Sequence, residues 1–169
     1  MVPRVSIGVP VYDGEAYLAS ALESLLAQTY GDLEIIVCDN ASTDGTETIA
    51  RAAAARDPRV RYVRAPENRG ALVNFNAAFA QARGAYFKWA AADDLVDPEL
   101  VARGVAVLER DPSVVLCHSN TRVIDADGAP VGDFAYARDY AGSAQPSARL
   151  GDMLRQDRWC FELFGVIRS

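Results

Sequence analysis

The sequence is poor in the residue types that many catalytic and metal centres use. Its 169 residues include one histidine and three cysteines. His118 alone gives no basis for a Ser/His/Asp or Cys/His arrangement, and we expect it to be a strand-end side chain rather than a catalytic base. Cys38, Cys117 and Cys160 lie far apart in apolar stretches and form no CxxC pair that would chelate zinc or carry electrons. The three residues indicate core thiols in a reducing compartment.

Long apolar runs and an excess of basic residues are also missing. No stretch approaches the roughly 18 apolar residues of a membrane span, and the apolar run near the N-terminus is too short for a signal peptide. We therefore expect a cytoplasmic protein. With 17 Lys and Arg against 23 Asp and Glu, the net charge is -6, which argues against an electrostatic nucleic-acid binder. A small anionic ligand would need a metal ion or backbone amides to hold it.

The sequence does contain a regular alternation of short apolar runs with helical periodicity. The run Val5–Val11 is nearly continuous, which is typical of a strand buried on both faces. Residues 15–28 carry apolar side chains at i, i+3 and i+4 spacing, which predicts a helix. The same two patterns recur, with strands expected at 33–39, 60–65 and 85–91 and helices at 46–56 and 71–83. Strands and helices in this order predict right-handed crossovers and a parallel sheet.

After residue 96 the pattern changes. Asp97-Pro98 begins another expected helix, 98–110, and a strand follows at 114–120. The Asp127-Gly128 pair is a hairpin signal, so we expect a partly antiparallel arrangement after residue 113. The remaining expectations are a surface loop at 133–145, a short helix at 147–156 and a final strand at 161–168, all within one α/β domain spanning 1–169.

Ligands of parallel α/β sheets bind beyond the carboxyl ends of the strands. The segments at those ends read PVYDGEAYL, VCDNASTDGT, ENRGALVNFNAAFAQARGAYFKW and AADDLVDP. In this order they resemble the PxYN, DDxSxDxT, NxGxxxAxNxG with AxGxY, and DxDD motifs of the family 2 glycosyltransferases, which are inverting nucleotide-sugar enzymes of the GT-A fold. The resemblance covers roughly residues 4–130. Each motif alone is a weak signal, but four motifs in register at four strand ends are a strong one.

Three positions depart from the motifs of that family. Asp13 stands where the family often has asparagine, and Asn40 replaces the second carboxylate of the DDxS motif. Ala91 occupies the position of the first Asp of DxD, which leaves Asp93 and Asp94. Some family members also keep only the later carboxylates, so a metal site there remains the expectation.

The resemblance implies a three-layer α/β/α GT-A fold with a mostly parallel, Rossmann-like sheet. Residues 4–96 would form the nucleotide-sugar-binding half, and 97–169 would begin an incomplete acceptor-side half. The resemblance also implies a divalent metal, Mn or Mg, bound by Asp93 and Asp94. The nucleotide contacts that it implies come from Pro10, Val11, Tyr12, Glu15, Asp39, Asn40, Asn68, Arg69 and Asp93.

Physical chemistry favours the same residue types. A diphosphate leaving group gains negative charge as the sugar departs, and a divalent ion held by one or two Asp side chains stabilises that charge. Asp39, at the end of the second strand, can accept a hydrogen bond from a base N–H or a ribose hydroxyl. The backbone from Pro10 to Tyr12 would form the floor under the base.

Each of these residues also has a purely structural interpretation. Asp93 and Asp94 can belong to a solvated helix-capping loop, and Asp39 can cap a turn through Ser42 and Thr43. For Asp44, stabilisation of a helix N-terminus is the expected role. Asn68 and Gly70 can have no role beyond forming a turn. For Trp89 we expect a place in the core rather than stacking against a sugar ring.

Inverting transfer needs a general base, and no late carboxylate lies in a matching motif, so we expect the base beyond Ser169. The expected activity is transfer of a sugar from a nucleotide-diphospho-sugar donor to a saccharide or lipid-linked acceptor of the cell envelope. That activity would permit peripheral association with the inner face of the membrane. A non-catalytic nucleotide-sugar-binding module is the alternative. A haloacid-type phosphohydrolase would need Asp where Ser42 stands, and a Rossmann dehydrogenase would need GxGxxG after the first strand.

Overall fold

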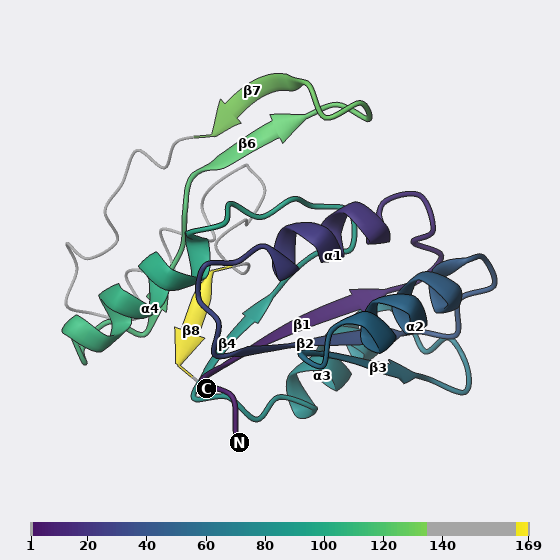
Figure 1. The fold of residues 1–169 in the computed structure, drawn as a ribbon, viewed down its shortest axis with the longest axis horizontal. Coiled ribbons are helices and arrows are strands. Elements are labelled where there is room, and N and C mark those ends of the chain that lie inside the picture. Colours follow the sequence, from purple (N-terminus) through teal and green to yellow (C-terminus); the bar gives the residue numbers. More distant parts are fainter. Residues whose placement is uncertain (1, 135–164, 169) are drawn as a thin grey trace. The chain divides into compact units, whose positions relative to one another are not determined.

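The computed structural model describes residues 2–134 and 165–168. Strands and helices alternate along the chain, as the apolar pattern predicts (Figure 1). The expected helix at 147–156 lies outside the described residues, as do most of the expected loop and residues 161–164 of the expected final strand. Residues 166–168 do form a strand, as expected. The elements are β1 (Val5–Val11), α1 (Leu18–Leu26), β2 (Leu33–Asp39), α2 (Thr46–Arg56), β3 (Val60–Arg64), α3 (Ala71–Ala80), β4 (Tyr86–Trp89), α4 (Leu100–Arg110), β5 (Leu116–Cys117), β6 (Thr121–Ile124), β7 (Pro130–Phe134) and β8 (Val166–Arg168).

Six strands form the main sheet in the order β3-β2-β1-β4-β8-β5. The first four strands are parallel, and β8 pairs antiparallel with both β4 and β5. This arrangement confirms the mostly parallel sheet with an antiparallel part after residue 113. Two compact units divide the chain, residues 1–117 with 164–169 and residues 118–163. None of the helices in the described residues is long and apolar enough to cross a lipid bilayer.

In the second unit, β6 and β7 form an antiparallel hairpin. Gly128 takes a positive φ of 81° at its turn, and the Asp125 carboxylate accepts the N–H groups of Asp127 and Ala129. The hairpin signal at Asp127-Gly128 is therefore confirmed. The expected loop from Asp133 is wrong at its first two residues, because Asp133 and Phe134 continue β7; Asp133 pairs with Arg122 across the hairpin.

Strand β2 contributes side chains to two separate apolar layers. Along β2, Leu33, Ile35 and Val37 join the larger core, which also contains the buried residues of α1, α2 and α4. The alternate residues Ile36 and Cys38 pack on the opposite face with Ala78 of α3. This period-two alternation produces three layers, with helices on both faces of the sheet.

The most buried residues of α3 are not its largest apolar ones. Leu72 and Phe79 are 76% and 43% exposed, whereas Asn74 and Ala78 are buried. A side chain at Gly8 of β1 would lie 3.0 Å from the Ala78 Cβ, so α3 approaches the sheet through two small residues. Because α3 contains no charged residue, its composition does not mark the solvent face, and close packing at Gly8 decides which face is buried.

A buried carboxylate fixes the turn between α3 and β4. Glu34 on β2 is 3% exposed, and its oxygens accept hydrogen bonds from Ser6 Oγ at 2.7 Å, Arg61 Nη1 at 2.9 Å and Arg83 Nη2 at 2.6 Å. Ser6 Oγ in turn accepts the backbone N–H of Gly84 at 2.8 Å. Burial raises the pKa of Glu34, but the hydrogen bonds from Arg83, Ser6 and Arg61 outweigh burial and hold that pKa below its usual value.

Replacing Glu34 with alanine should lower the free energy of unfolding by about 2 kcal/mol at neutral pH, because Arg83, Arg61 and Ser6 lose a shared acceptor. The folded-state pKa lies below the unfolded value, so the contribution is complete above about pH 4.3 and disappears as the pH falls through the folded pKa. Urea unfolding of the wild type and Glu34→Ala should therefore converge in acid.

Glu109→Ala is the matched control for this prediction. Glu109 also pairs with an arginine, Arg4 Nη2 at 2.9 Å, but both side chains are exposed. Such surface pairs contribute roughly 0–1 kcal/mol. Equal losses of stability in the two variants at neutral pH would contradict the role assigned to Glu34.

Candidate functional site

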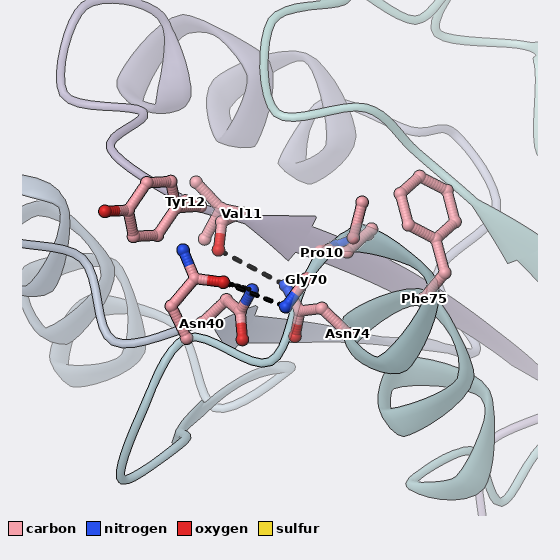
Figure 2. A pocket seen from close by; sticks show the side chains of 9 residues that line it. Pro10, Val11, Tyr12, Asn40, Gly70, Asn74 and Phe75 are labelled. Carbon is pink, nitrogen blue, oxygen red and sulfur yellow. Dashed lines mark hydrogen bonds between the residues drawn. The ribbon is translucent and has the colours of Figure 1, made fainter.

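A cavity of about 240 Å³ lies at the carboxyl ends of β1 and β2, beside the first turns of α3 (Figure 2). This is the place where ligands of parallel α/β sheets bind. No charged residue lines the cavity, so its walls suit an uncharged part of a ligand. The lining residues are Pro10, Val11, Tyr12, Asn40, Asn68, Gly70, Ala71, Asn74 and Phe75.

Hydrogen bonds between neighbouring elements define the floor of this cavity. The N–H of Asn40 donates to the carbonyl oxygen of Val11 at 2.9 Å, which extends the β1–β2 pairing one step past the strand ends. Asn74 Nδ2 donates to the carbonyl oxygens of Val11 at 3.2 Å and Cys38 at 2.9 Å. Only the amide nitrogen of Asn74 can donate to two carbonyls, so its orientation is fixed. Asn74 thereby joins α3 to both strands.

A second set of amide contacts holds the loop between β3 and α3. Asn40 Nδ2 donates to Asn68 Oδ1 at 2.7 Å, and Asn40 Oδ1 accepts the N–H of Arg69 at 3.1 Å. Asn68 Oδ1 also accepts the N–H of Gly70 at 2.9 Å. Gly70 has a φ of 83°, a conformation that glycine adopts without a steric penalty. Asn68 and Gly70 are thus both turn residues and parts of the cavity wall.

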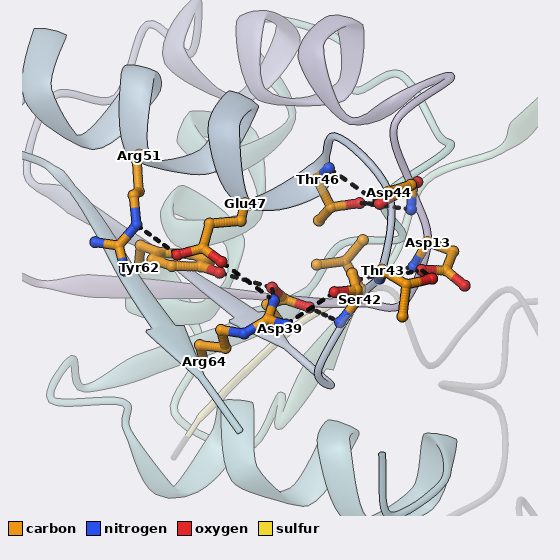
Figure 3. A network of polar contacts seen from close by, with 12 residues as sticks. Asp13, Asp39, Ser42, Thr43, Asp44, Thr46, Glu47, Arg51, Tyr62 and Arg64 are labelled. Carbon is orange, nitrogen blue, oxygen red and sulfur yellow. Dashed lines mark hydrogen bonds and ion pairs between the residues drawn. The ribbon is translucent and has the colours of Figure 1, made fainter. Parts of the chain in front are cut away.

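Asp39 lies inside the protein next to the cavity rather than on its wall (Figure 3). Its side chain has no exposed surface. Asp39 Oδ1 accepts the N–H of Ser42 at 2.8 Å, and Oδ2 accepts both Tyr62 Oη and Arg64 Nη1 at 2.6 Å. The turn-capping interpretation is therefore confirmed for Ser42, while the N–H of Thr43 donates elsewhere, to Asp13.

The interactions of Asp39 keep its carboxylate ionised. Burial raises its pKa, but hydrogen bonds from Ser42, Tyr62 and Arg64 lower it by more. Burial and the hydrogen bond to Asp39 raise the pKa of Tyr62 to about 12. At neutral pH the cluster therefore holds an ionised Asp39, a neutral Tyr62 and a charged Arg64.

Glu15 and Asp44 connect the loop after β1 to the start of α2. Glu15 Oε2 accepts the N–H of Gly45 at 2.9 Å, and Asp44 Oδ2 accepts the N–H of Glu15 at 2.9 Å. Asp44 Oδ1 also accepts the N–H of Thr46, the first residue of α2, at 3.0 Å. The role expected for Asp44 at the helix N-terminus is confirmed, and Glu15 does not line the cavity.

Asp93 and Asp94 are exposed residues of the loop after β4, and neither lines the cavity. Although Asp94 is exposed overall, neighbouring protein atoms displace part of the water around its carboxyl group. This desolvation and the charge of Asp93 raise the pKa of Asp94, and Lys88 acts in the opposite direction. Lys88 is buried, its Nζ donates to the carbonyl oxygen of Trp89 at 3.0 Å, and burial lowers its pKa to about 8.

Two adjacent carboxylates that repel each other fit a hard divalent cation, which takes oxygen ligands. Within residues 2–134 and 165–168, no three His, Cys, Asp or Glu side chains converge as a metal-binding group. A divalent cation held by Asp93 and Asp94 would need further oxygen ligands from another source.

Of the residues expected to contact a nucleotide, the structure brings five together around the cavity, namely Pro10, Val11, Tyr12, Asn40 and Asn68. Arg69 contributes a backbone contact to Asn40. Sequence reasoning missed Asn74, because α3 carries two asparagines, Asn74 and Asn76, and the sequence does not show which of them is buried. It also missed Arg64, which lies inside the expected strand 60–65 rather than beyond its carboxyl end. Trp89 is half-buried and stacks edge-on against Phe87.

The chain resembles known proteins in both sequence and structure. The family model for glycosyl transferase family 2 matches residues 6–153. Chondroitin synthase of Escherichia coli is 35% identical over 127 residues, which are 75% of this chain and 18% of the relative. The putative glycosyltransferase EpsE of Bacillus subtilis is 34% identical over 127 residues, 75% of this chain and 46% of the relative. The chain thus spans less than half the length of these relatives.

Two solved structures share the fold. The mannosyltransferase PcManGT from Pyrobaculum calidifontis, in complex with GDP-Man and Mn²⁺, matches with a TM-score of 0.62 and 32% identity, covering 69% of this chain and 35% of that one. S. aureus TarS matches with a TM-score of 0.60 and 26% identity, covering 63% and 32%. Both are GT-A glycosyltransferases, which confirms the expected three-layer GT-A fold. Because the family model spans most of its length, the chain belongs to glycosyl transferase family 2.

Proposed function

We propose that this chain binds the nucleotide-diphospho-sugar donor of a glycosyltransferase. The observation that carries the proposal is the uncharged cavity at the carboxyl ends of β1 and β2, bounded by Tyr12 on one side and α3 on the other. The base and ribose are the uncharged part of such a donor. Amide groups from Asn40 and Asn68 offer hydrogen bonds to their polar edges, and the ring of Tyr12, which is 48% exposed, offers an apolar face.

In this proposal the Asp39 carboxylate accepts a hydrogen bond from the nucleotide. An ionised carboxylate has about four acceptor sites, and Asp39 accepts hydrogen bonds from Ser42, Tyr62 and Arg64. We assign a base N–H or a ribose hydroxyl as a further partner of this carboxylate. Because the side chain has no exposed surface, a ligand would reach it only after Arg64 or Tyr62 shifts. Arg69, whose side chain is exposed, remains a candidate phosphate contact.

The diphosphate of the donor would lie beyond the cavity, with a divalent Mn or Mg ion held by Asp93 and Asp94. When bound, such an ion stabilises negative charge on the departing diphosphate. The chain's own contribution is to orient the two carboxylates in the loop after β4, where Lys88 offsets part of their charge. The related mannosyltransferase structure contains GDP-Man and Mn²⁺, which supports a donor that binds together with a divalent ion.

In the complete protein we propose transfer of the sugar, with inversion, to a saccharide or lipid-linked acceptor hydroxyl. The carboxylates Asp157 and Glu162 lie outside the described residues, so neither is assigned as the general base here. Among the relatives, the chondroitin and hyaluronan synthases are named for polysaccharide products, which favours a polysaccharide acceptor. The alternative, a non-catalytic nucleotide-sugar-binding module, is favoured only by the lack of an assigned base within residues 2–134 and 165–168.

Asn40→Ala should weaken binding of GDP or UDP by about 1–3 kcal/mol, because it removes one wall of the cavity and two hydrogen bonds to the β3–α3 loop. The measurement is the ligand-induced rise in melting temperature, since a ligand specific for the native state stabilises it. Asn76→Ala is the control, because Asn76 is an exposed α3 residue outside the cavity. Equal ligand-induced shifts in the Asn40 and Asn76 variants would contradict the placement of the nucleotide.

Asp93→Asn and Asp94→Asn should each leave the fold intact and reduce the part of nucleotide binding that depends on manganese. Both side chains are exposed, and the neutral amide is a poorer ligand for a hard cation. Calorimetric titration with and without Mn²⁺ separates metal-dependent from metal-independent affinity. Asp97→Asn is the control, because Asp97 caps the N–H of Glu99 through Oδ1 and asparagine keeps that acceptor. Unchanged manganese dependence in both test variants would refute the metal site.

A further inference from the structure

The loops that leave β1 and β2 share one backbone feature. In each loop a residue of the cavity wall, Tyr12 or Asn40, is followed directly by a residue in the left-handed conformation. Asp13 has a φ of 49° and Ala41 a φ of 62°, and they are the only non-glycine residues with positive φ in the described residues. Such conformations persist only where the surroundings hold them, and they concentrate at functional sites.

Reciprocal hydrogen bonds between the two loops hold this backbone in place (Figure 3). The N–H of Asp13 donates to Ser42 Oγ at 3.0 Å, and Asp13 Oδ1 accepts the N–H of Thr43 at 2.7 Å. One residue further along, the N–H of Gly14 donates to Thr46 Oγ1 at 2.8 Å. The loops are therefore connected immediately after both cavity residues have left the sheet.

Asp13 makes these contacts from the protein surface. Its side chain is exposed, so the hydrogen bond to Thr43 is not needed to satisfy a buried carboxylate. Asp13 also does not line the cavity. The Asp13–Thr43 hydrogen bond instead connects the loop that carries Tyr12 to the loop that carries Asn40. Tyr12 is adjacent to Asp13 in the sequence, and Asn40 lies three residues before Thr43, so the bond constrains the distance between the two cavity residues.

We propose that Asp13 is a positioning residue for nucleotide binding, acting through Thr43 to hold Tyr12 and Asn40 at their spacing across the cavity. The proposal rests on the nucleotide-binding role proposed above. The acceptor oxygen of Asp13, not its charge, is the effective group, because it receives a backbone N–H. Asparagine supplies the same acceptor and tolerates the left-handed conformation, so it should replace Asp13 without loss.

The test is calorimetric titration of GDP and of UDP, each with Mn²⁺, into the wild type and the variants Asp13→Ala, Asp13→Gly and Asp13→Asn. Whichever nucleotide binds the wild type should bind the alanine and glycine variants about tenfold more weakly, on the scale of coupling through a hydrogen-bond network beside a site. Glycine keeps the backbone free of strain, so this variant tests the acceptor even if the alanine variant unfolds. Asp13→Asn should bind within about twofold of the wild type.

Asp111→Ala is the matched control. Asp111 Oδ1 accepts the N–H of Ser113 at 2.9 Å and its Oγ at 2.7 Å, in the turn after α4. This variant should lose stability in urea as the Asp13 variants do, yet keep full nucleotide affinity. An equal loss of nucleotide affinity in the Asp111 and Asp13 variants would overturn the proposal. Wild-type nucleotide affinity in Asp13→Gly, or reduced nucleotide affinity in Asp13→Asn, would also overturn it. Failure of the wild type to bind either nucleotide would instead overturn the proposed function, and this role with it.

Discussion

The parallel pairing of β1 with β2 is the constraint on which the site depends. Its register places Val11 beside Asp39, and the hydrogen bond from the N–H of Asn40 to the Val11 carbonyl carries the pairing past the strand ends. Tyr12 and Asn40 therefore leave the sheet at the same level and form adjoining walls. Asn74 then joins α3 to the same carbonyl, so three elements meet at one point and enclose the cavity.

The two buried carboxylates of β2, Glu34 and Asp39, both form ion pairs with arginines. Glu34 binds Arg61 and Arg83, and Asp39 binds Arg64. A buried charge is costly without a partner, so these arginines serve the fold. None of these charged groups lines the cavity, whose walls are neutral amides, aromatic rings and backbone. Such a lining favours a base and ribose, while a diphosphate needs a cation or backbone amides elsewhere.

Sequence reasoning predicted the first strands and the edge of the sheet that carries the cavity, because both follow from short-range patterns. Val5–Val11 and Leu33–Asp39 match the expected strands at both ends, and the strand-end rule located Pro10, Tyr12 and Asn40. The buried face of α3 was not predictable in this way, because it depends on the missing side chain of Gly8 on a different strand.

The internal hydrogen bonds of Asp39 were equally hidden from the sequence. They require Tyr62 and Arg64 to lie beside the end of β2, and that placement comes from the register of β2 with β3, which pairs Asp39 with Arg64. A pattern within one segment indicates which residues leave a strand end. It does not indicate which side chains of the next strand will bind them.

The central claim is that the cavity beside Tyr12, Asn40 and α3 binds the nucleotide. The most direct measurement is a titration of the ¹⁵N-labelled chain with GDP and UDP in the presence of Mg²⁺, followed by amide chemical-shift changes. We expect the largest changes at Tyr12, Asn40, Gly70 and Phe75, with smaller ones along α4. Changes centred on another surface, or none with either nucleotide at saturating concentration, would contradict this account.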